Sequence, residues 1–180
     1  MHICSQVIEE YFRLNIACVD IVPATFVQSG ILPPTFQAGI ECLSIEQPDT
    51  LVAVLTFFSK LLSYAMTLKE SQQPVVADLT SVNVSSSQPP SEVARHNLVH
   101  IETVIRQFGG ELTYKMLYGN LYIFPRDFQT DVDSCFKYMV KLMPLESQQW
   151  MLDAVQRLPA TNLTAKEKNK FVMDYNAYVY

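Results

Sequence analysis

The sequence has little charge and little glycine. Only 17% of its 180 residues are charged, 49% are hydrophobic, and glycine occurs 5 times. The net charge of -5 argues against non-specific nucleic-acid binding, which needs clustered lysine and arginine. It permits a basic protein partner. The apolar excess predicts a buried core, or an element that packs against more protein.

Cysteine is also sparse and is not spaced for metal binding. The four cysteines are Cys4, Cys18, Cys42 and Cys135. None forms a Cys-x-x-Cys pair, which argues against a zinc site. Each lies in an apolar run, where a buried free thiol is expected. The sequence therefore predicts no metal and no cofactor.

Targeting and membrane signals are missing as well. The N-terminal segment lacks the basic start, apolar middle and small-residue cleavage site of a secretory signal. The longest apolar stretch, Leu51 to Met66, is interrupted by polar residues. A spanning helix needs roughly 20 predominantly apolar residues. We therefore expect no membrane insertion, and a protein of the cytoplasm and nucleus.

Motifs for catalysis are absent from the sequence. It has no Gly-x-Ser-x-Gly elbow and no glycine-rich phosphate loop. His96 and His100 are four residues apart on a predicted helix, so both could face one metal ion. However, the glutamate of a zinc-protease motif is missing between them, and exposed helix histidines are the simpler interpretation. We expect no catalytic residues and no enzyme activity.

The dominant period of the sequence is helical, and prolines separate the apolar runs. A domain of residues 1–180 is expected, made of repeats at 1–66, a flexible surface loop at 67–91, a long-helix repeat at 92–143 and a C-terminal capping repeat at 144–180. Helices are predicted at His2–Val19, from Pro23 to Gly30, from Leu32 to Ile45, and at Pro48–Met66, 92–116, Arg126–Leu142, 144–158 and Ala165–Tyr178.

Two local features within these helices carry further expectations. Gly109 and Gly110 interrupt an apolar stripe, and since glycine costs roughly 1 kcal/mol in a helix interior, they predict a kink or a close helix contact. Asp127, Asp131 and Asp133 gather at the start of one helix. They either compensate the helix dipole or form an acidic patch that receives a basic partner.

Helix pairs joined by short turns recur about every 40 residues, which is the period of HEAT and armadillo arrays. The expected fold is therefore all-α: an α-solenoid of HEAT-like antiparallel helix pairs whose second helices face inward. The last helix begins with a capping box, Thr164 to Glu167, as suits a terminal cap. The first helix carries apolar residues on more than one side, including Val7 and Phe12, which predicts an open edge.

Three stretches resemble a known family. They are Leu-Pro-Pro-Thr-Phe-Gln-Ala-Gly-Ile-Glu-Cys-Leu at 32–43, Val-Leu-Thr-Phe-Phe-Ser-Lys-Leu-Leu at 54–62, and Trp-Met-Leu-Asp-Ala-Val-Gln-Arg-Leu-Pro at 150–159. In order and spacing they resemble the late HEAT repeats of the transportin-SR/importin-13-like branch of the importin-β (karyopherin-β) family. The resemblance extends over most of the chain.

The resemblance implies a receptor that carries protein cargo, such as basic or RNA-binding proteins, through nuclear pores under control of the GTPase Ran. It implies that Ran and nucleoporins bind upstream repeats not present here, and that this chain supplies the C-terminal arch. Asp127, Asp131 and Asp133 are the candidate protein-binding residues, from the acidic-patch interpretation above. The alternative function is a generic helical-repeat scaffold or adaptor unrelated to nuclear transport.

Overall fold

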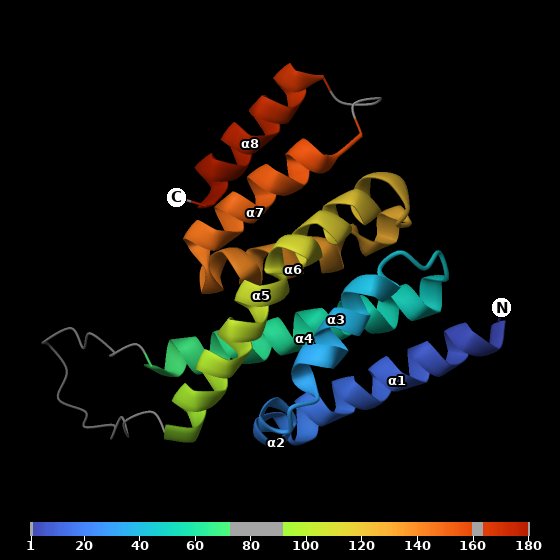
Figure 1. Ribbon diagram of the computed structural model, residues 1–180, viewed down its shortest axis with the longest axis vertical. Helices are drawn as coiled ribbons and strands as arrows, with labels where there is room; N and C mark the ends of the chain where they lie inside the picture. The colour runs from blue at the N-terminus through green and yellow to red at the C-terminus, as the bar shows by residue number, and fades with distance from the viewer. Residues whose placement is uncertain (1, 73–91, 160–163, 180) are drawn as a thin grey trace, which may run out of the picture.

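Every regular element that the computed structural model describes is a helix. It describes residues 2–72, 92–159 and 164–179 (Figure 1). The all-α prediction is thereby confirmed. The elements are α1 (His2–Ile21), α2 (Pro23–Gln28), α3 (Leu32–Cys42), α4 (Pro48–Gln72), α5 (Glu92–Tyr122), the 3-10 helix η1 (Arg126–Phe128), α6 (Gln129–Leu142), α7 (Pro144–Arg157) and α8 (Ala165–Val179).

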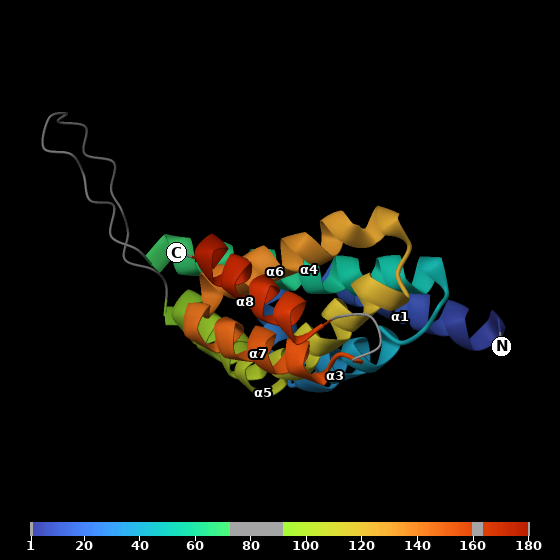
Figure 2. The ribbon, with the colours of Figure 1, turned by 90° about the horizontal axis from the view of Figure 1, so that it is seen from above.

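The helices lie in two layers. In one layer α1 packs on α4, and α4 packs on α6; in the other α3 packs on α5, and α5 packs on α7. Figure 2 shows α4 and α6 above, with α3, α5 and α7 below. Within these two layers, each helix therefore neighbours a helix that is not the next one in sequence. Consecutive helices such as α3 and α4 instead pack across the layers.

Local sequence signals define several helix ends. Proline occupies the first turn of α2, α3 and α7, where its missing N–H has no intrahelical partner to lose. Gly30 separates α2 from α3 with a φ of 72°, a conformation that residues with a Cβ rarely adopt. The predicted capping box is confirmed: Glu167 N–H donates to Thr164 Oγ1 at 3.3 Å, and Thr164 N–H donates to Glu167 Oε2 at 2.8 Å.

Helix α4 is the centre of the main core. It packs against both α1 and α6, and Leu51, Leu55, Phe58 and Leu62, which follow one another at steps of three and four, are completely buried. By length and composition alone α4 could cross a membrane, but 61% of its most apolar window is buried inside the protein. Burial against other helices accounts for its apolar character.

The prediction for residues 67–91 was wrong at its start. Helix α4 continues to Gln72, so residues 67–72 are helical and not part of a loop. Leu68 is buried in the core and Lys69 reaches the end of α6, so tertiary contacts extend the helix beyond the predicted end at Met66. The remainder of the predicted loop, residues 73–91, lies outside the described residues.

The paired glycines of α5 make a close helix contact, one of the two outcomes that their position predicts. Helix α5 is assigned as one continuous helix through Gly109 and Gly110. The Trp150 indole of α7 lies so close that a Cβ on Gly109 would meet it at 2.5 Å. The absence of side chains at these positions therefore lets α7 approach α5.

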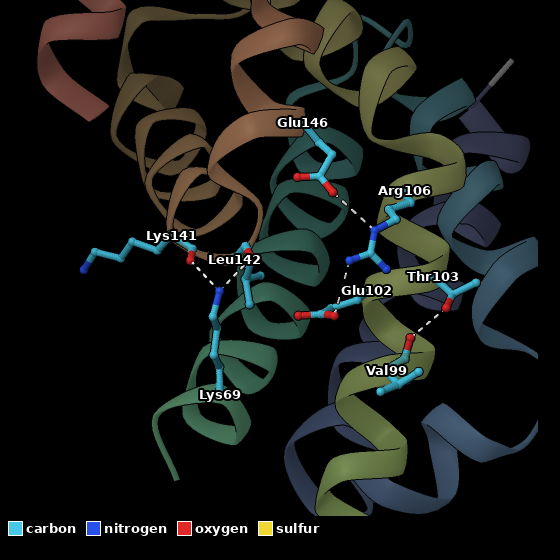
Figure 3. A network of polar contacts seen from close by, with 8 residues as sticks. All are labelled: Lys69, Val99, Glu102, Thr103, Arg106, Lys141, Leu142 and Glu146. Carbon is cyan, nitrogen blue, oxygen red and sulfur yellow. Dashed lines mark hydrogen bonds and ion pairs between the residues drawn. The ribbon is translucent and has the colours of Figure 1, made fainter. Parts of the chain in front are cut away.

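Lys69 joins the end of α4 to the end of α6. Its Nζ donates to the carbonyl oxygens of Lys141 at 2.9 Å and Leu142 at 2.7 Å (Figure 3). These are carbonyls of the last turn of α6, which have no intrahelical N–H partner and carry the negative end of the helix dipole. The Lys69 ammonium group donates hydrogen bonds to these carbonyl oxygens and places a positive charge at the negative end of the dipole.

Replacing Lys69 with methionine is expected to lower the free energy of unfolding by about 1–2 kcal/mol, because two charge-assisted hydrogen bonds are lost while the aliphatic stem is kept. Urea denaturation followed by circular dichroism measures the change. Lys137→Met is the matched control, since Lys137 is exposed and forms no ion pair within residues 2–72, 92–159 and 164–179. Equal losses in the two variants would contradict this role for Lys69.

Candidate protein-binding surface

The three predicted acidic residues lie close in sequence but do not form one patch. Asp127 belongs to η1, whereas Asp131 and Asp133 belong to the first turns of α6. Asp127 and Asp133 are exposed and Asp131 is half-buried. Residues two apart on a helix point about 200° apart, so Asp131 and Asp133 face different sides.

Asp131 faces toward the buried side of α6, beside Cys135 one turn later. Burial, and to a smaller extent the negative charge of Asp131, raise the pKa of the Cys135 thiol to about 12. The thiol therefore stays protonated at neutral pH and cannot act as a nucleophile. Cys42 is half-buried, and its pKa is raised by burial and then by Glu41.

Within residues 2–72, 92–159 and 164–179, none of the three aspartates forms an ion pair or a hydrogen bond with another side chain; the carboxylates that do so are others. Asp131 stands in the first turn of α6 and Asp127 in η1, where negative charge is favourable at the positive end of the dipole. Dipole compensation and partner binding thus remain compatible for the exposed pair, Asp127 and Asp133.

His96 and His100 line a shared hollow between α5 and α2. Its volume is about 650 Å³, and Glu92 and Gln28 are also part of its wall. His100 Nε2 is buried without a hydrogen-bond partner. The hollow is open to solvent. No group of three histidine, cysteine, aspartate or glutamate side chains is placed to hold a metal ion among the residues that the structure describes.

Ion pairs connect the surfaces of α5 and α7, and sequence patterns did not predict them. Arg106 of α5 contacts Glu146 of α7 at 3.3 Å and Glu102 of its own helix at 3.6 Å (Figure 3). Arg157 contacts Glu111 at 2.9 Å, and its guanidinium carbon lies 3.7 Å from the ring centroid of Tyr114. The two α5–α7 pairs join residues 40 and 46 positions apart in the sequence. Helical periodicity cannot predict contacts over such separations.

Comparison with known proteins gives one distant relative among the curated proteins. An uncharacterized protein of the fission yeast Schizosaccharomyces pombe (strain 972) is 23% identical over 177 residues. The match covers 96% of this chain and 17% of the relative, so the chain spans about a sixth of that protein's length. No model of a protein family matches the chain.

Proposed function

We propose that the chain is a segment of an α-solenoid that binds proteins, built from HEAT-like antiparallel helix pairs. The observation that carries the proposal is the layered packing: α1, α4 and α6 stack in one layer, and α3, α5 and α7 stack in the other. Pairs that stack only on their neighbours are the defining arrangement of such solenoids. Under this proposal the pairs are α3–α4, α5–α6 and α7–α8, and α1 is the second helix of a further pair.

We further propose that this solenoid is the C-terminal part of a nuclear transport receptor of the importin-β type. The support is the resemblance at residues 32–43, 54–62 and 150–159, which fall in α3, α4 and α7. A relative about six times as long as the aligned segment is compatible with a large receptor. The receptor would carry protein cargo between cytoplasm and nucleus without catalysing a reaction.

In this proposal the layer of second helices receives the cargo. Asp133 and Lys137 of α6 are exposed, as is Lys60 of α4, which pairs with Asp20 of α1 at 3.0 Å. Asp127 and Asp133 add unpaired negative charge at the start of α6. A basic segment of a cargo would gain charge-assisted hydrogen bonds there, with a contribution that weakens at high salt.

Replacing Asp127, Asp131 and Asp133 together with asparagine is expected to weaken binding of a basic cargo by about tenfold, which corresponds to about 1.4 kcal/mol. Fluorescence anisotropy with a labelled basic nuclear protein at two salt concentrations measures the effect in the longest product of the gene. The control replaces Glu10, Glu46 and Glu70 with glutamine, which removes the same charge from exposed positions elsewhere.

Two outcomes separate the parts of the proposal. Unchanged cargo affinity in the aspartate variant would remove the acidic residues from the binding surface. Cargo release that does not respond to Ran loaded with GTP would contradict the transport receptor and leave a general protein-binding scaffold. Circular dichroism of the triple variant shows whether the loss of charge at the start of α6 has weakened the helix itself.

A further inference from the structure

The hollow between α2 and the first turns of α5 has the size of a binding site. Its volume is about 650 Å³, and pockets for ligands usually measure about 300–1,000 Å³. Figure 1 shows α2 and the start of α5 at the same end of the molecule, where the two helices pack on each other. Val93 and Val99 add apolar surface to the hollow, with 52% and 55% of their surfaces exposed. One side chain of α2 and four of α5 give it a polar lining: Gln28, Glu92, Arg95, His96 and His100.

The wall of the hollow at α2 is fixed by the helices behind it. Gln28 Nε2 donates to Asn97 Oδ1 of α5 at 2.9 Å, and Asn97 Nδ2 donates to the Tyr64 hydroxyl of α4 at 3.5 Å. Asn97 is only 1% exposed, so this chain of hydrogen bonds runs through the interior. The hollow therefore exists before a ligand arrives, and a preformed site loses little conformational entropy on binding.

The hollow lies within the described helices and not at an end of the proposed solenoid. A preceding helix pair would stack on α1 and α3, whereas the walls of the hollow are α2 and α5, which already pack on each other. A neighbouring repeat is therefore not required to complete it.

Arg95 places a cation without a counter-ion at the hollow. It is exposed and forms no ion pair with any residue of 2–72, 92–159 and 164–179. It stands in the first turn of α5, where the free N–H groups of the helix add positive potential. Glu92 is the carboxylate of the lining. A carboxylate ligand carries one negative charge and pairs bidentately with Arg95, whereas a phosphate group with up to two charges meets stronger repulsion from Glu92.

The two histidines supply further polar groups on the same side of α5. His96 and His100 are four residues apart, so their side chains are neighbours on the helix surface. His100 Nε2 is buried and has no hydrogen-bond partner in the part of the chain that the structure describes. A buried polar atom without a partner is costly, and a ligand that contacts His100 removes part of this cost.

We propose that the hollow binds a peptide segment of a partner protein in which a carboxylate stands beside an aliphatic side chain. The carboxylate accepts hydrogen bonds from Arg95 and His96, and the aliphatic side chain covers Val93 and Val99. The hollow is open to solvent, which lets a continuing polypeptide enter and leave it, whereas sites for small molecules enclose most of the ligand. This acidic partner differs from the basic cargo proposed for α6, so the inference goes beyond the proposed function and does not depend on it.

Fluorescence anisotropy with a labelled peptide of alternating glutamate and leucine tests the proposal on the 180-residue chain. This peptide is expected to bind saturably, and a peptide of alternating lysine and leucine is not. Arg95→Glu should weaken binding at least tenfold, because it removes the ion pair and adds a repelling charge. Arg126→Glu is the matched control, since Arg126 lies in η1, is exposed and forms no ion pair in the described ranges, and its variant should bind normally. A peptide of alternating glutamate and serine should bind more weakly, because it leaves the two valines uncovered.

The histidines of the chain provide an independent measurement of where the peptide binds. In proton NMR spectra the glutamate–leucine peptide should shift the imidazole signals of His96 and His100 and leave the signal of His2 in α1 unchanged. Absence of saturable binding overturns the proposal, as do binding that Arg95→Glu leaves unchanged and a shift confined to His2. Displacement of the peptide by millimolar inorganic phosphate also overturns it, since the hollow would then be a general anion site. These outcomes leave the basic cargo untouched, because its test replaces the aspartates of η1 and α6.

Discussion

Phe58→Ala is expected to remove a large part of the free energy of unfolding at 25 °C. Phe58 is completely buried on α4, with its ring 5.0 Å from Phe36 in an edge-on contact and 5.5 Å from Phe57. It also fills the space above Gly39 of α3, where a Cβ would meet the ring at 2.7 Å. Removing such a ring costs about 3–5 kcal/mol, a large part of the 5–15 kcal/mol that stabilises a typical domain.

Two controls make this expectation specific. Phe58→Leu fills most of the space and should cost less than half as much as alanine, because the remaining cavity is smaller. Phe171→Ala removes the same ring from α8, where 44% of the side chain is exposed, and should cost less than about 1 kcal/mol. Urea denaturation provides all three values, and a loss in Phe58→Ala no larger than in Phe171→Ala would contradict the central role of α4.

Helix positions were predictable because their cause is local. The steps of three and four that place Leu51, Leu55, Phe58 and Leu62 on one side of a helix are visible in the sequence, and all four are buried. The end of α4 was not predictable, because Lys69 is held by carbonyl oxygens of α6 more than 70 residues away. A polar stretch after Met66 resembles a loop until that distant contact is known.

For the acidic residues too, the local sequence predicts the position in the helix, whereas distant packing decides which side chain is exposed. The sequence places Asp127, Asp131 and Asp133 at the start of a helix, and the structure agrees. Sequence spacing alone suggested one patch, but α6 turns Asp131 toward Cys135 and leaves Asp133 in solvent. Which side of α6 is buried depends on its packing against α4 and α7, and this could not be derived from the three residues themselves.

Gly109→Ala is expected to destabilise the protein, although alanine is the better helix former. A Cβ at this position would lie 2.5 Å from two carbon atoms of the Trp150 ring, well inside van der Waals contact. Overpacking of this kind costs about 1–3 kcal/mol, which exceeds the roughly 1 kcal/mol that alanine gains over glycine in a helix interior. Because α7 rests on α5 here, tryptophan fluorescence should report loosening of α7 before the helices around α4 unfold.

The sign of the effect should reverse when Trp150 is removed. In a Trp150→Ala background the clash no longer exists, so Gly109→Ala should stabilise the protein by up to about 1 kcal/mol through helix propensity alone. Gly110→Ala provides the intermediate case, since its Cβ would lie 3.2 Å from the indole and require only a small shift. Chemical denaturation of the four members of the Gly109–Trp150 cycle measures the coupling. If Gly109→Ala destabilises both backgrounds equally, close approach to Trp150 is not the reason for glycine at this position.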